Sequence, residues 1–207
     1  MKWFAYLLIV AGVSTMFYPK AKSMYYSYQE QQLLEDWESS AEGSLIQQSY
    51  QQLDNVFTEK TRPKNASDFS SKPNILGKLT INQIDLTIPI MEGASQQNLK
   101  VAAGHLKGTA PIGEPGNAAI AAHRSYTYGK QFNRLTEVKT GDLIKVETNH
   151  KKLTYKITEK LLVKPTDLSV LQNHKNQSVI TLITCHPMKN PTHRYIVKAV
   201  LQKEEVL

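Results

Sequence analysis

The chain has 207 residues, of which 41% are hydrophobic and 21% charged, and it carries a formal net charge of +7 at pH 7. This length and composition exclude two large domains, a disordered or collagen-like chain and a multi-span membrane protein, because they fit one globular domain with additional segments. The single cysteine, Cys185, excludes an intramolecular disulfide. The stability of the fold must therefore come from packing.

The first segment of the chain is apolar. Trp3 to Tyr18 is a run of sixteen residues without a charge. This run is close in length to a membrane-spanning helix, which needs about 17–25 residues, and longer than the apolar core of most signal peptides. Aromatic residues at both ends are typical of a spanning helix, and no clear small-x-small cleavage site follows the run. We therefore expect residues 1–22 to form an N-terminal signal-anchor, with a cleaved signal peptide as the alternative.

The segment after the apolar run is acidic. Residues 23–59 hold seven acidic side chains, no basic one and many glutamines. Their apolar residues recur at roughly helical spacing, which predicts one or two amphipathic helices. Linker-like residues follow as far as residue 73. We interpret residues 23–72 as an acidic, Gln-rich spacer and linker; the alternative is an arm that packs on the following basic domain as a cover or regulator.

The last part of the chain, residues 73–207, is basic, with 18 Lys and Arg against 10 Asp and Glu. Short β-branched runs separated by turns predict seven or eight strands. Residues 95–102 and 132–138 have room only for short helices, and residues 106–117 form a Gly- and Pro-rich loop. The fold class is therefore mostly β, a closed barrel or a sandwich. The predicted strands are 76–82, 85–91, 118–122, 143–148, 152–163, 179–185 and 194–201.

Three residues at strand ends carry the candidate chemistry. Cys185 ends one buried strand, His123 ends another, and Arg194 opens the strand that follows Cys185. If the loop between Cys185 and Arg194 closes an antiparallel hairpin, the two residues flank its mouth. A thiolate attacks carbonyl carbons, an imidazole transfers protons near neutral pH, and a guanidinium holds negative charge that develops on an oxygen. Together these groups predict acyl-transfer machinery.

Each of these residues also has a plainer interpretation. A lone cysteine is most often a buried small hydrophobe, and a histidine in a turn is more often structural than catalytic. A zinc site would combine Cys185 with histidines, but the second cysteine and the usual spacing are missing. The basic charge alone does not indicate nucleic-acid binding, because the chain has no recognised nucleic-acid motif. The histidines of such a zinc site would be His105, His123, His186 and His193.

Three segments resemble one known family. Thr181-Leu182-Ile183-Thr184-Cys185 is similar to the TLxTC signature of the sortases, the surface-protein transpeptidases of Gram-positive bacteria. The segment Ala121 to Arg124, followed by Phe132-Asn133-Arg134-Leu135, resembles the histidine segment of that family, and Thr192 to Val197 resembles its arginine strand. The resemblance extends from about Leu76 to Leu201. One departure is Ala122, where a glycine is common.

The resemblance implies a fold and a reaction. The fold is an eight-stranded β-barrel with short helices at residues 73–207, held outside the cytoplasm by the N-terminal membrane anchor. Cys185 attacks an LPxTG-like sorting signal after its threonine and forms a thioester, His123 protonates the leaving amine, and Arg194 stabilises the oxyanion or binds the backbone of the signal. Thr184 is a further candidate for substrate binding. An amine of a cell-wall precursor or of peptidoglycan resolves the thioester, and no cofactor or metal ion is expected.

The subclass and the rival functions follow from smaller features. The short loop from His186 to His193 and the chain end without a hydrophobic anchor favour a class A-like or class D-like sortase. Few carboxylates lie in residues 106–117 and 164–177, so we predict no calcium dependence. Other Cys and His enzymes, such as L,D-transpeptidases, need a different motif or order. The non-enzymatic alternative is a membrane-anchored β-barrel that binds anionic wall polymer.

Overall fold

The computed structural model describes Trp3, residues 46–57 and residues 75–207. One compact unit, Leu45–Leu207, contains every element described below. The predicted signal-anchor at residues 1–22 lies outside the described residues apart from Trp3. Residues 23–45 and 58–72 of the predicted spacer and linker also lie outside them. Within the described part of the chain, no helix is both long enough and apolar enough to cross a membrane.

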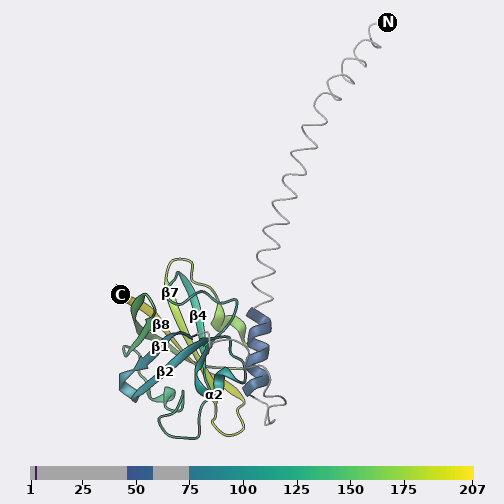
Figure 1. The fold of residues 1–207 in the computed structure, drawn as a ribbon. Coiled ribbons are helices and arrows are strands. Elements are labelled where there is room, and N and C mark those ends of the chain that lie inside the picture. Colours follow the sequence, from purple (N-terminus) through teal and green to yellow (C-terminus); the bar gives the residue numbers. More distant parts are fainter. Residues whose placement is uncertain (1–2, 4–45, 58–74) are drawn as a thin grey trace. The chain divides into compact units, whose positions relative to one another are not determined.

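The predicted mostly β fold is confirmed, and its eight strands form a closed barrel (Figure 1). The strand order around the barrel is β1-β2-β3-β4-β7-β8-β6-β5. Two neighbouring pairs, β2 with β3 and β4 with β7, are parallel, and the other pairs are antiparallel. The strands are β1 (Ile75–Ile81), β2 (Leu86–Glu92), β3 (Ala103–His105), β4 (Gly116–Ala121), β5 (Leu143–Thr148), β6 (Lys151–Val163), β7 (Ser178–His186) and β8 (His193–Val206).

The strand missing from the predicted set is β3. Its three residues, Ala-Gly-His, are too few and too small to give an alternating pattern, yet all three are buried. The predicted helical segments are confirmed in shortened form, as α2 (Asn98–Val101) and a 3-10 turn (Leu135–Glu137). Two further 3-10 turns cover Asn82–Ile84 and Leu168–Leu171.

Strand β7 separates two hydrophobic clusters because its side chains alternate between the faces of the sheet. Ile180 and Leu182 point into the barrel, where they join the main core with residues of the seven other strands. Ile183 and Cys185 belong to a second cluster on the opposite face of the strand. The uninterrupted apolar run of β7 is therefore explained by two separate packing partners.

The parallel pairing of β4 with β7 brings two strand ends together. Ala121 lies opposite Ile183, and the Ala122 amide donates to the Ile183 carbonyl at 3.1 Å. The Thr184 hydroxyl donates to the Ala122 carbonyl at 2.8 Å. Because the two strands run in the same direction, His123, two residues after Ala121, lies at the level of Cys185, two residues after Ile183.

Residues 46–57 form a helix whose apolar side chains Tyr50, Leu53 and Phe57 are at most 9% exposed. These three residues belong to the same hydrophobic cluster as Ile183 and Cys185. The helix, which we call the covering helix, therefore packs against the barrel (Figure 1). Residues 46–57, part of the stretch interpreted as a spacer, are thus packed on one face, and burial of that face stabilises the packed arrangement.

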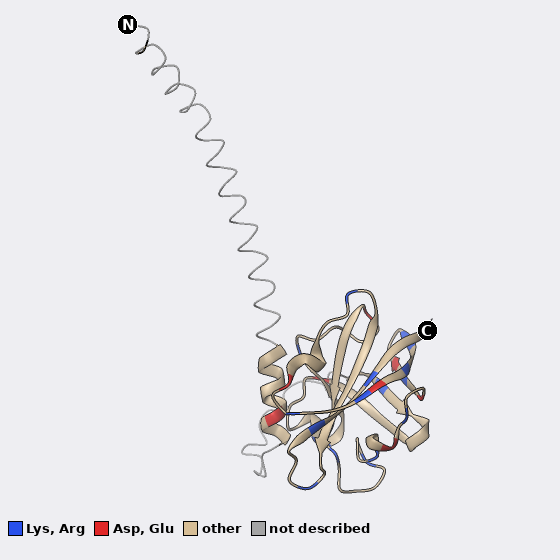
Figure 2. Cartoon of the chain, turned by 180° about the vertical axis from the view of Figure 1, so that it is seen from behind, with Lys and Arg blue, Asp and Glu red and all other residues tan. Residues whose placement is uncertain are grey.

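Charged residues of both signs are interspersed over the barrel (Figure 2). Lys151 contacts Glu204 at 3.0 Å and Glu114 at 3.1 Å, and Lys78 contacts Glu147 at 3.0 Å. These exposed pairs add little stability. They do place part of the basic charge of residues 73–207 next to acidic partners.

Candidate active site

Cys185 and Arg194 face each other on neighbouring strands, and this confirms the expected hairpin. The two residues are paired in the antiparallel ladder of β7 and β8. Nη1 of Arg194 donates to Sγ of Cys185 at 3.9 Å, and it also donates to the His193 carbonyl at 3.2 Å. Arg194 is only 1% exposed. A buried positive charge thus lies directly beside the thiol.

His123 joins this pair through an aromatic side chain. The ring of Phe57 lies 5.4 Å from the His123 ring between centroids, at an interplanar angle of 53°. The guanidinium carbon of Arg194 lies 5.1 Å from the centre of the same Phe57 ring. His123 and Arg194 thus contact the same phenylalanine of the covering helix, and Arg194 in turn contacts Cys185.

Arg124 holds the loop that carries His123. Its Nη1 contacts Nδ1 of His186 at 2.9 Å, and its Nη2 donates to the Thr136 hydroxyl at 3.2 Å. The pKa of His186 is lowered by burial and by the Arg124 charge, so its neutral ring accepts the hydrogen bond from Arg124. Because His186 follows Cys185 directly, this contact ties the histidine loop to the end of β7.

The same loop is closed by hydrogen bonds across its base. The Phe132 amide donates to the His123 carbonyl at 3.1 Å, and the Asn133 side-chain amide donates to the Ser125 carbonyl at 2.6 Å. Sequence reasoning missed the positioning roles of Arg124, Asn133 and His186. The signal available for Arg124 was its place directly after His123, but its partners lie up to 62 positions away.

The thiol and the imidazole are both uncharged at neutral pH in this arrangement. Burial raises the pKa of Cys185 to about 11, and the Asp54 carboxylate adds to the rise while Arg194 and Arg124 oppose it. Burial also lowers the pKa of His123. Desolvation disfavours the charged form of each group, so the covered site holds a thiol and a neutral imidazole.

The covering helix also pairs with the guanidinium. The Asp54 carboxylate accepts a hydrogen bond from Nη2 of Arg194, and the two side chains form an ion pair. The side chain of Asp54 is 38% exposed, whereas the side chain of Arg194 is 1% exposed. A donor that could hold a developing oxyanion is therefore occupied by a carboxylate of the same chain. In this conformation Phe57 and Asp54 together close the site.

Thr184 is fully buried, with 0% of its surface exposed. Its hydroxyl proton is used in the bond to the Ala122 carbonyl described above. In this conformation Thr184 offers no surface to a substrate, and its contact holds β7 to the residue that precedes His123.

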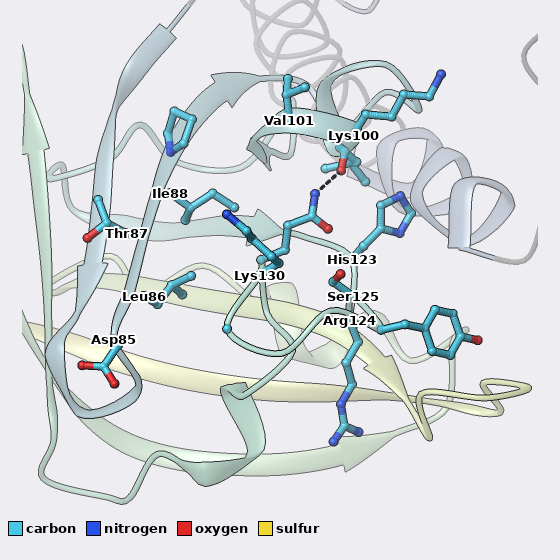
Figure 3. A pocket seen from close by; sticks show the side chains of 15 residues that line it. Asp85, Leu86, Thr87, Ile88, Lys100, Val101, His123, Arg124, Ser125 and Lys130 are labelled. Carbon is cyan, nitrogen blue, oxygen red and sulfur yellow. Dashed lines mark hydrogen bonds between the residues drawn. The ribbon is translucent and has the colours of Figure 1, made fainter.

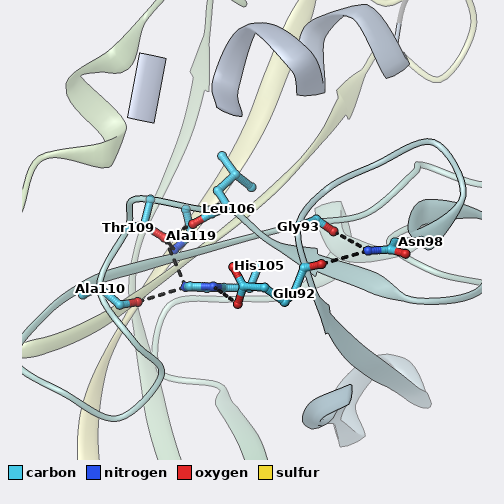
Figure 4. Close-up of polar contacts among 8 residues, drawn as sticks. All are labelled: Glu92, Gly93, Asn98, His105, Leu106, Thr109, Ala110 and Ala119. Atoms are coloured by element: carbon cyan, nitrogen blue, oxygen red, sulfur yellow. Dashed lines mark hydrogen bonds and ion pairs between the residues drawn. The ribbon is translucent and has the colours of Figure 1, made fainter. Parts of the chain in front are cut away.

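His105 lies in a separate cluster of polar contacts on β3 (Figure 4). Its Nδ1 contacts the Glu92 carboxylate at 3.2 Å and its Nε2 contacts the Ala110 carbonyl at 2.9 Å. Both ring nitrogens thus have polar partners from the loop and strand around them. This cluster fixes the loop before β4 to the ends of β2 and β3. Cys185 takes no part in it.

Comparison with known proteins agrees with this fold and constellation. The family model of the sortase domain matches residues 79–202, so the chain belongs to the sortase family. Sortase A of Bacillus anthracis is 30% identical over 126 residues, which are 61% of this chain and 59% of that protein. The chain thus spans less than two thirds of this curated relative.

Solved structures give the same family likeness. Sortase A of Listeria monocytogenes superimposes with a TM-score of 0.61 at 28% identity, over 64% of this chain and 90% of that chain. Sortase C2 of pilus island 1 of Group B Streptococcus gives a TM-score of 0.61 at 28% identity, over 79% of this chain and 97% of that chain. The expected eight-stranded sortase barrel is confirmed.

Proposed function

We propose that this protein is a membrane-anchored cysteine transpeptidase of the sortase type, with its catalytic domain outside the cytoplasm. It cleaves an LPxTG-like sorting signal through a thioester on Cys185 and transfers the acyl part to an amine of a cell-wall precursor or of peptidoglycan. The observation that carries this proposal is the thiol of Cys185 next to the buried guanidinium of Arg194, with His123 beside the same covering phenylalanine.

The first step is activation of the thiol. Because Cys185 and His123 are both neutral when covered, a proton must pass from Sγ to the imidazole before or during attack. Removal of the covering helix lowers the pKa of Cys185, since it reduces burial and takes away the nearby Asp54 carboxylate. The reactive pair of ions therefore forms more readily in the open site.

The second step is formation and collapse of the tetrahedral intermediate. Sγ of Cys185 bonds to the carbonyl carbon, and negative charge develops on the carbonyl oxygen. Arg194 stabilises this charge, because it is permanently protonated and already lies beside Sγ. The imidazolium of His123 then gives its proton to the departing amine, and the acyl group stays on Cys185 as a thioester.

Both steps require that the covering helix moves away. Phe57 contacts His123 and Arg194, and Asp54 occupies Arg194, so a substrate carbonyl has no access while they are in place. The packing of this helix is imperfect: the buried Tyr50 hydroxyl has no hydrogen-bond partner among the described residues. Such an unsatisfied group costs about 1–3 kcal/mol and favours release of the helix.

The subclass is also a proposal. A class A-like or class D-like enzyme fits the short loop between β7 and β8, which joins His186 to His193. The covering helix precedes the barrel, where the pilus-polymerising members of the family carry their lid. This position is shared with those members, so the short loop between β7 and β8 is the feature that supports the class A-like or class D-like proposal.

The test uses the full-length chain in detergent with a quenched LPxTG-type peptide and hydroxylamine. Cleavage with formation of a hydroxamate is expected in the native chain and not in the Cys185→Ala variant, because hydroxylamine resolves only a thioester. The proposal would be contradicted if neither the native chain nor the Asp54→Asn, Phe57→Ala variant, which releases the helix, cleaves any sorting-type peptide.

The wall-polymer-binding barrel remains the alternative, and it is favoured by one observation. Cys185 is only 7% exposed, as a packing cysteine is. Resistance of the native thiol to alkylation does not separate the two functions, because the covering helix protects it in either case. Peptide cleavage by the Asp54→Asn, Phe57→Ala variant does separate them: a catalytic thiol yields the hydroxamate, whereas a packing thiol yields none.

A further inference from the structure

A groove is lined by His123 but not by Cys185. It has a volume of about 860 Å³ and lies between β2, the end of α2 and the loop after β4 (Figure 3). Leu86 and Ile88 of β2 line it, as do His123 and Tyr126 of the loop after β4. We call it the imidazole groove. Cys185 and Arg194 are not among its lining residues.

The position of the groove assigns it to one half of the reaction. The acyl half of the substrate stays bonded to Cys185, whereas the amine half must reach His123 to receive a proton. The acceptor amine must reach the same imidazole to give a proton back. A groove that includes His123 and excludes Cys185 therefore suits the amine side of the scissile bond.

The groove is open while the rest of the site is covered. None of the residues 46–57 lines it, although Phe57 contacts the His123 ring. One hydrogen bond joins two of the segments that line it. The Gln131 side-chain amide donates to the Leu99 carbonyl at 2.6 Å and so connects the loop after β4 to α2 (Figure 3). The groove is thus a formed feature of the barrel that does not depend on release of the covering helix.

The charge in the groove indicates what it binds. Lys100 and Lys130 line it, both are exposed, and neither has an ion-pair partner among the described residues. Arg124 also lines it but points toward His186 and Thr136 (Figure 3). The one acidic lining residue, Asp85, contacts Arg134 at 3.3 Å. The two lysines therefore leave a net positive charge for an occupant.

We propose that the imidazole groove binds the acceptor amine and that Lys100 and Lys130 select acceptors that carry an anionic group on the same short chain as the amine. This group is a carboxylate or a phosphate, and the exposed side chains of Val101 and Tyr126 provide apolar contact for the chain that bears it. The inference rests on the proposed function and names the second substrate of the same site.

The transfer step is balanced without any further reactant. The acceptor nitrogen bonds to the thioester carbon, and the bond between that carbon and Sγ of Cys185 breaks. One proton leaves the amine for neutral His123 and passes to the departing sulfur, so the thiol and the neutral imidazole are restored. The products are an amide and the starting enzyme.

The experiment measures acceptor selectivity in the full-length chain in detergent, with the Asp54→Asn, Phe57→Ala changes present throughout. Triglycine, triglycinamide and 2-aminoethyl phosphate compete in turn with hydroxylamine for the thioester, and the ratio of amide to hydroxamate is recorded. We expect triglycine to be favoured over triglycinamide, and Lys100→Glu with Lys130→Glu to reduce that preference about fivefold, the order expected for reversing two exposed charges. Preference for aminoethyl phosphate over triglycine identifies phosphate as the source of the charge.

The matched control reverses two exposed lysines on the barrel that do not line the groove, Lys145→Glu and Lys156→Glu. It has the same net charge, and we expect it to keep the native selectivity. Hydroxamate formation with equal use of triglycine and triglycinamide, or an equal loss of selectivity in the control, overturns the inference and leaves the proposed function intact. Absence of hydroxamate from every variant overturns both.

Discussion

The two hydrophobic clusters on either side of β7 differ in what they contain. The cluster inside the barrel is built from apolar side chains of the strands, such as Leu79, Ile120 and Leu182. The cluster under the covering helix includes the thiol of Cys185 and adjoins the pair of Asp54 and Arg194 and the unpartnered hydroxyl of Tyr50. The first cluster maintains the fold, whereas the second combines packing with the groups to which we assign the chemistry.

The largest expected effect separates the two clusters by stability. Leu182 and Leu53 are both leucines with at most 1% exposure, but they lie in different clusters. Leu182→Ala should lower the free energy of unfolding by about 2–5 kcal/mol, because it opens a cavity in the barrel. Leu53→Ala should lower the free energy of unfolding of the barrel much less, and it should raise the rate of peptide cleavage. Urea unfolding measures both, and equal losses would show that the clusters form one cooperative core.

The second effect concerns the guanidinium between the clusters. Arg194→Lys keeps the charge but loses the planar fork, so we expect kcat for LPxTG-type peptides to fall about a hundredfold, as for loss of one oxyanion donor. Lys198→Arg, on the same strand, is the matched control and should retain its activity. Activity near the native value in Arg194→Lys would show that a point charge is sufficient.

The third effect is the pH dependence of stability in the second cluster. The pKa of Cys185 is raised to about 11 in the folded chain, above its value in the unfolded chain. The folded state therefore keeps the thiol proton up to a higher pH than the unfolded state does. The stability that the buried thiol contributes is present below about pH 9 and is lost as the pH rises toward about 11. Between pH 8 and pH 10.5 the native chain should lose about 2 kcal/mol more than Cys185→Ala. Parallel pH profiles for the two chains would contradict the burial of the thiol.

The smallest effect is release of the covering helix. Asp54→Asn with Phe57→Ala should raise the rate of Cys185 alkylation and of peptide cleavage about tenfold, the change that follows from losing about 1.4 kcal/mol of docking. Gln48→Ala, on the exposed face of the same helix, is the control and should change neither rate. A double variant that reacts like the native chain would mean that the helix does not limit access.

The barrel was largely predictable because its strands carry their own signal. Alternation and β-branched residues indicated seven strands, and the strand ends placed Cys185, His123 and Arg194 near one another. The missing strand, Ala103–His105, has no pattern of its own and exists because β2 and β4 flank it.

The covering helix shows where sequence reasoning ends. The spacing of Tyr50, Leu53 and Phe57 predicts an apolar face but does not say what the face covers. The pairing of Asp54 with Arg194 joins positions 140 residues apart, and only the closed barrel brings them together. The same holds for the hydrogen bond from the Thr184 hydroxyl to the Ala122 carbonyl, which joins β7 to the residue before His123.

The shielding of Cys185 has a consequence for oxidation. Oxidants attack the thiolate, and a sulfenic acid on Cys185 would find no second cysteine in the chain with which to form a reversible disulfide. Burial under Tyr50, Leu53 and Phe57 keeps the sulfur protonated and away from solvent. While it is packed on the barrel, the covering helix thus protects the single cysteine of the chain against irreversible oxidation.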